Sequence, residues 1–74
     1  MTLVKAFGQV LRETRKNSGI SQEALALICG LDRTFISLLE RGQRQPTLSS
    51  IFAIADALEI TPSIMLANVE RLTK

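Results

Sequence analysis

The chain has 74 residues, a mass of 8.1 kDa, 46% apolar residues and a formal net charge of +2. A chain of this length has room for one small core, so we expect a single domain over residues 1–74. The absence of histidine and the single cysteine, Cys29, exclude an intrachain disulfide, a Cys/His metal site and a histidine-activated nucleophile. We therefore expect no catalytic residue, metal, cofactor or small-molecule ligand.

The charges are divided unevenly along the chain. Residues 1–44 carry seven basic and four acidic side chains, a net charge of +3, whereas residues 45–74 carry two basic and three acidic ones, a net charge of −1. An anionic partner would therefore dock on the first of these segments. No apolar run reaches the length of a membrane span and no signal-peptide layout is visible, so we expect no membrane partner and a cytoplasmic location.

Apolar spacing and capping residues predict five short helices and no strand. In the first part of the chain, apolar residues at three- and four-residue intervals predict a helix over 3–17. Ser21 and Asp32 are good N-cap residues, and they predict helices over 22–29 and 33–41.

In the second part, Thr47 and Thr61 are N-cap residues, and Pro62 suits the first position of a helix. They predict a fourth helix after Thr47 and a fifth helix over 62–72. The predicted buried stripe of the fourth helix comprises Leu48, Ile51, Phe52, Ala55 and Leu58. The predicted fold class is therefore all-α, a compact five-helix bundle.

Residues 22–41 meet the steric requirements of a helix-turn-helix. Ala26 is small, as needed where the two helices nearly touch, and Gly30 tolerates the positive φ that the turn requires. Ile36 and Leu39 are apolar at the positions where the second helix faces the core. These residues together predict that motif.

The chain resembles the repressor/Cro-type (XRE-like) helix-turn-helix family over residues 7–66. The resemblance rests on Ser-Gln-Glu-x-Leu-Ala at 21–26, Ile-Ser-x-x-Glu-Arg-Gly at 36–42 and Pro-Thr-Leu at 46–48. The segment Leu-Asp-Arg-Thr-Phe-Ile-Ser at 31–37 is particularly similar to the small controller proteins of restriction–modification systems. Similar segments are also seen in stand-alone phage and chromosomal regulators.

The resemblance implies a lambda-repressor-like domain that regulates transcription by binding specific double-stranded DNA. Its recognition helix, residues 33–41, would lie in the major groove. The implied base contacts are Arg33, Thr34, Phe35 and Ser37. The implied phosphate contacts are Gln22, Arg41, Gln43, Arg44 and Ser49. A structural ion pair between Arg15 and Glu40 would align the recognition helix.

The predicted helix over 62–72 extends past the minimum of the family and carries an apolar stripe. A small chain gains stability by burying such a stripe against its own copy, and two-fold dimers are the commonest assembly. The candidate interface of a homodimer comprises Ile60, Ile64, Met65, Val69 and Leu72, although Met65 and Leu66 equally suit the core of one chain. A dimer would bind a near-palindromic operator with half-sites about 34 Å apart.

The chain departs from the family pattern at Leu27, Ile28, Leu38 and Ile64, where polar residues are usual. Extra apolar residues on a small surface indicate partner contacts. Leu38 would pack on thymine methyls, whereas Leu27 and Ile28 either form a higher-order contact or are tolerated on the surface.

Two function classes follow from these features. A regulator, such as a repressor or a controller protein, would occupy a promoter or contact RNA polymerase from a nearby site. The alternative is a protein-interaction module such as an antitoxin or an accessory subunit, and the extra apolar residues favour it.

Overall fold

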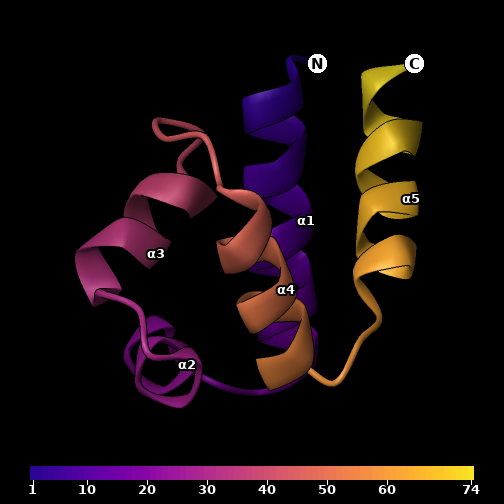
Figure 1. Cartoon of the computed structure of the whole chain (residues 1–74). Helices are drawn as coiled ribbons and strands as arrows, with labels where there is room; N and C mark the ends of the chain where they lie inside the picture. Colours follow the sequence, from indigo (N-terminus) through magenta and orange to yellow (C-terminus); the bar gives the residue numbers. More distant parts are fainter.

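The computed structural model describes all 74 residues and consists of five helices without a strand (Figure 1). The helices are α1 (Leu3–Asn17), α2 (Gln22–Cys29), α3 (Arg33–Glu40), α4 (Leu48–Ala57) and α5 (Pro62–Thr73). The all-α prediction is confirmed. In Figure 1, α1 and α5 run side by side in opposite directions, and α2 and α3 lie on the other side of α1. The helix-turn-helix pair therefore occupies one flank of the bundle.

Capping sets the boundaries of α2 and α3. Ser21 and Asp32 each accept a hydrogen bond from a backbone amide of the following turn, at 3.0 and 2.8 Å. Gly30 closes α2 with φ = 71°, a left-handed conformation that favours glycine. α3 ends one residue before the predicted end because Arg41 is its C-cap and Gly42, with φ = 69°, turns the chain away.

One hydrophobic core joins all five helices. Its 13 buried residues are Ala6, Phe7, Val10, Leu11, Leu25, Ala26, Ile36, Leu39, Ile54, Ala55, Leu58, Met65 and Val69. Ala26, Ile36 and Leu39 are buried as the helix-turn-helix motif requires. The core thus holds α3 by its inner face and leaves its outer face for another partner.

The buried face of α4 differs from the predicted stripe. Leu48 and Phe52 are 70% and 54% exposed, whereas Ile54 is fully buried. α4 has apolar residues around most of its circumference, so helical spacing alone does not determine which series faces inward. The packing of α2 and α5 against α4 decides this, and it leaves an apolar surface exposed.

α4 and α5 meet at a sharp corner. No single helix is long and apolar enough to cross a membrane; α4 and α5 reach that length and composition only as a pair bent by 110°. At the corner, Glu59 has φ = 57°, a left-handed backbone conformation that ends the path of α4. The bend brings α5 back alongside α1 (Figure 1).

Candidate nucleic-acid interface

The first turn of α3 presents polar side chains to solvent. Arg33 and Thr34 are exposed, and Ser37 lies one turn further along the helix and is half-buried. The side chains of these three residues make no hydrogen bond or ion pair within the chain. Arg33 therefore has its full fork of N–H donors available, and two of them match O6 and N7 of guanine.

Phe35 and Leu38 are less available than Arg33. Phe35, an implied base contact, is half-buried and packs against the core. Leu38 is half-buried as well. Only the exposed part of each of these two side chains can contact a base. The polar residues of the first turn therefore provide most of the side-chain groups on α3 that a partner can reach.

Glu40, the last residue of α3, is held by an ion pair. Arg15 Nε and Nη2 donate to the two carboxylate oxygens of Glu40 at 2.6 and 3.1 Å. The two side chains are only 11% and 3% exposed, respectively. Arg15 Nη1 also donates to the carbonyl oxygen of Ile20 at 2.9 Å, so the guanidinium links α1 to the segment that precedes α2.

The environment of Arg15 favours the charged form of its guanidinium group. The hydrogen bond to Glu40 and the attraction of its carboxylate raise the pKa of Arg15, while burial acts in the opposite direction. The arginine therefore stays protonated under all ordinary conditions. A bidentate pair of this kind fixes orientation as well as distance, so it determines how the C-terminal end of α3 sits on α1.

Gln22 belongs to the same network. Its Nε2 donates to Glu40 Oε1 at 3.0 Å. Because a carboxylate only accepts, this bond determines which end of the amide points at Glu40, and the second N–H of Nε2 remains available. Gln22 is also the first residue of α2, where backbone amides lack partners within the helix and attract anions. The structure therefore pre-orients this implied phosphate-binding residue.

The loop after α3 carries the other implied phosphate contacts. Arg41, Gln43 and Arg44 are exposed, as is Ser49 in the first turn of α4. The amide of Gln43 donates to the carbonyl oxygen of Leu38 at 2.9 Å, which ties this loop to the end of α3. Polar donors of this set thus come from three segments: the start of α2, the loop after α3 and the first turn of α4.

The predicted dimer residues divide into two groups. Met65 and Val69 are 0% and 2% exposed and belong to the core of the single chain. The prediction that they form an interface is therefore wrong, because α5 turns this i, i+4 pair inward. Leu72 also packs against the core. Ile60 is half-buried and packs against the core as Leu72 does, whereas Ile64 is 53% exposed and keeps surface for a partner.

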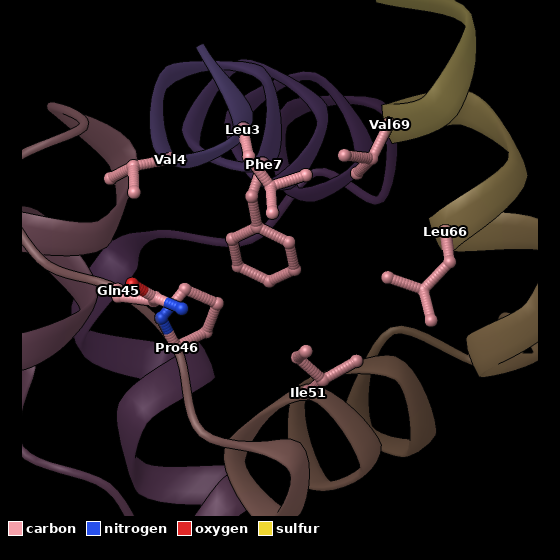
Figure 2. Close-up of a pocket in the computed structure, with 8 residues that line it drawn as sticks. All are labelled: Leu3, Val4, Phe7, Gln45, Pro46, Ile51, Leu66 and Val69. Carbon is pink, nitrogen blue, oxygen red and sulfur yellow. The ribbon is translucent and has the colours of Figure 1, made fainter. Parts of the chain in front are cut away.

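An apolar pocket of about 110 Å³ opens between α1, the loop before α4, α4 and α5 (Figure 2). It is lined by Leu3, Val4, Phe7, Gln45, Pro46, Ile51, Leu66 and Val69. No charged side chain and no residue of α2 or α3 contributes to it. The pocket is therefore separate from the polar surface around α3.

No group of three metal-ligating side chains comes together in the chain.

Comparison with known proteins identifies the family of this chain. A family model described as helix-turn-helix matches residues 11–65, and the chain belongs to this family. Among its relatives is the control protein C.BamHI of Bacillus amyloliquefaciens, 46% identical over 61 residues that cover 81% of this chain and 75% of that protein. The relatives are regulators rather than enzymes.

Solved structures of controller proteins share the fold. The restriction–modification controller protein C.AhdI of Aeromonas hydrophila superposes with a TM-score of 0.80 and 51% identity, covering 85% of this chain and 94% of that one. The C.Esp1396I tetramer, solved in complex with its natural 35 base-pair operator, has a TM-score of 0.86 and 31% identity, covering 96% and 93%. The resemblance to controller proteins seen in the sequence is confirmed.

Proposed function

We propose that this protein is a transcription regulator that binds a near-palindromic operator in double-stranded DNA as a homodimer. The observation that carries the proposal is the unpaired Arg33 and Thr34 at the exposed start of α3, while Glu40 holds Gln22 beside the other end. Recognition helices read base edges with their N-terminal residues, while neighbouring donors hold the phosphates. The solved operator complex of C.Esp1396I, which has the same fold, supports this assignment.

Base reading falls to Arg33, Thr34 and Ser37, with a smaller contribution from the exposed part of Phe35. Arg33 makes the contact with the largest discrimination, since a bidentate arginine–guanine pair is worth about 1–3 kcal/mol against the wrong base. The phosphate contacts are Gln22, Arg41, Gln43, Arg44 and Ser49. They set the register of α3 in the groove without reading sequence.

The dimer interface is the exposed apolar surface around the α4–α5 corner. Phe52 and Ile60 line one shallow hollow at this corner together with Asp56, Glu59, Thr61 and Pro62, and Ile64 follows in the first turn of α5. Burying these apolar side chains against a second copy removes apolar surface from water, and each Å² of apolar surface removed contributes about 25 cal/mol of favourable free energy. A two-fold axis there would present two α3 helices to half-sites about 34 Å apart.

Regulation would follow from occupancy of the operator. The dimer is the form that binds both half-sites, so occupancy rises steeply with the concentration of the protein itself. The bound dimer would exclude RNA polymerase from a promoter or contact it from a nearby site. Its place of action would be the cytoplasm, together with its DNA.

A protein-interaction module is the second candidate function, and one observation favours it. Leu27 and Ile28 on α2 are 85% and 60% exposed, which is unusual for adjacent aliphatic residues without a partner. The salt dependence of binding distinguishes the two functions. Phosphate-mediated binding weakens by orders of magnitude between about 50 and 200 mM salt, whereas apolar protein binding does not.

The deciding experiment selects bound sequences from random DNA with the wild type and with Arg33→Ala. We expect a two-fold symmetric consensus that relaxes at one position of each half-site in the variant. Sedimentation of wild type and Ile64→Glu tests the interface, with a dimer and a monomer expected, respectively. Selection that yields no enriched sequence at low salt would overturn the proposal in favour of protein binding.

A further inference from the structure

A cleft on the side of α1 gathers basic side chains next to the end of α3. It is lined by Met1, Lys5, Gln9, Arg12, Glu40, Arg41 and Gly42. Lys5, Gln9 and Arg12 are spaced i, i+4 and i+7, so they share one face of α1. The sequence offers no reason to connect this face with Arg41, which the fold places in the same cleft.

Close backbone packing holds the two sides of the cleft together. A Cβ on Gly8 would lie 2.4 Å from the carbonyl oxygen of Leu39, so α1 crosses the end of α3 at backbone distance. A Cβ on Gly42 would lie 2.8 Å from Cγ of Lys5. The stem of Lys5 therefore rests on the turn that carries Arg41, and its ammonium group extends from a defined position.

The cleft is electropositive because its cations are unpaired and its one carboxylate is neutralised. Lys5, Arg12 and Arg41 are exposed and form no ion pair within the chain. Both carboxylate oxygens of Glu40 already accept hydrogen bonds from Arg15. Three positive charges thus face solvent, and the one carboxylate of the lining is already paired with Arg15.

We propose that Lys5 and Arg12 bind backbone phosphates of the operator and extend the phosphate contacts of Arg41 along α1. This inference rests on the proposed function. Arg41 belongs both to the phosphate-binding loop and to the cleft, so a DNA strand that contacts Arg41 also meets the mouth of the cleft. Lys5 and Arg12 lie about 10 Å apart along α1, and each strand carries one phosphate per about 3.4 Å of helix axis. The two side chains therefore bind different phosphates.

The test compares Lys5→Gln and Arg12→Gln with Lys16→Gln as the matched control. Glutamine keeps much of the aliphatic stem and removes the charge. Lys16 is an exposed residue of the same helix that does not line the cleft. Affinity for the selected operator is measured against salt concentration for the wild type and each variant, and thermal unfolding verifies the fold.

Each cleft variant should lower affinity and reduce the slope of log K against log salt by about 1.8 for the dimer, because each of its two copies loses one phosphate contact worth about 0.9 on duplex DNA. The consensus sequence should not change. Lys16→Gln should retain the wild-type slope, and Lys5→Arg, which keeps the charge, should retain it as well.

A second measurement replaces single operator phosphates by uncharged methylphosphonates. Neutralising a phosphate that Lys5 binds should weaken operator binding by the wild type and should have no further effect on binding by Lys5→Gln. The same holds for a phosphate that Arg12 binds and the variant Arg12→Gln. The inference is overturned if both cleft variants match Lys16→Gln in slope, or if no phosphate is coupled to either residue while the wild type binds its operator. A wild type that binds no DNA would overturn the proposed function as well, so the two failures are distinguishable.

Discussion

The two ends of α3 are built differently. At the C-terminal end, the carboxylate of Glu40 is 3% exposed and is held by Arg15 and Gln22, and the backbone packs directly on Gly8. At the N-terminal end, Arg33 is exposed and its side chain forms no hydrogen bond or ion pair, and Asp32 caps the first turn through the amide of Thr34. One end is anchored, and the other is open to a partner.

This difference separates positioning from reading. The anchored end sets the direction of α3 relative to α1 and α2, so the phosphate-binding residues and the base-reading residues keep a constant spacing. At the open end, the side chains of Arg33 and Thr34 are exposed and form no hydrogen bond or ion pair within the chain, so they can be replaced at little cost in stability. Substitutions at the anchored end should therefore mainly change stability, whereas substitutions of Arg33 and Thr34 should mainly change binding.

The largest effect is expected for Glu40→Ala. Removing one partner of a buried ion pair leaves the other charge uncompensated, which typically costs about 3–5 kcal/mol in the free energy of unfolding. Chemical denaturation measures this loss. Glu70→Ala is the control, because Glu70 forms an exposed pair with Lys74 at 3.8 Å and should contribute almost nothing. Equal stability of the two variants would mean that Arg15 and Glu40 do not anchor α3.

Gly8→Ala tests the backbone contact of the anchored end. Helix propensity alone would make this change stabilising by about 1 kcal/mol, since glycine is a poor helix former. The added Cβ, however, would lie 2.4 and 2.8 Å from two backbone carbonyl oxygens of α3, which cannot move without shifting the helix.

We therefore expect Gly8→Ala to destabilise the fold by about 1–3 kcal/mol, as overpacking of a core does. The sign of the change in the denaturation midpoint decides the question. A more stable variant would show that α1 and α3 do not meet at backbone distance.

Arg33→Ala tests the open end. We expect operator binding to weaken by about 1–3 kcal/mol per half-site, with a relaxed base preference at one position of each half-site. The denaturation midpoint should not change, since the side chain has no partner within the chain. A titration of operator DNA paired with an unfolding curve measures both quantities. A loss of stability in this variant would contradict the separation of the two ends.

The smallest effect is expected at the cap of α3. Asp32→Ala removes the acceptor for the amide of Thr34 and should cost about 1 kcal/mol of stability. Asp32→Asn keeps an acceptor in the same place and serves as the control. Thermal unfolding distinguishes them, and an alanine variant as stable as the asparagine variant would show that the first turn does not depend on its cap.

Local chemistry explains why much of the fold is readable in the sequence. Ser21, Asp32, Thr47 and Thr61 begin helices at the predicted positions because a capping hydroxyl or carboxylate bonds an amide only two or three residues away. Gly30 ends α2 for an equally local reason, its positive φ. The resemblance also indicated the Arg15–Glu40 pair, which joins residues 25 positions apart.

Other features depend on which surfaces the fold brings together. Phe52 is predicted to be buried but is exposed, whereas Met65, a candidate interface residue, is buried in the core. Both belong to apolar series at helical spacing, and the packing of neighbouring helices determines which series enters the core. The bond from Gln22 to Glu40 links residues 18 positions apart and follows from no spacing rule.

The uneven charge along the chain can be read directly from its residues, and the helices and the turn between α2 and α3 follow from local patterns. Helices and turn depend on hydrogen bonds and dihedral preferences within a few residues. The covering of apolar faces, the orientation of Gln22 by Glu40 and the position of Lys5 and Arg12 beside Arg41 depend instead on how the helices pack. Gly8 allows α1 and α3 to pack closely because it has no side chain between them.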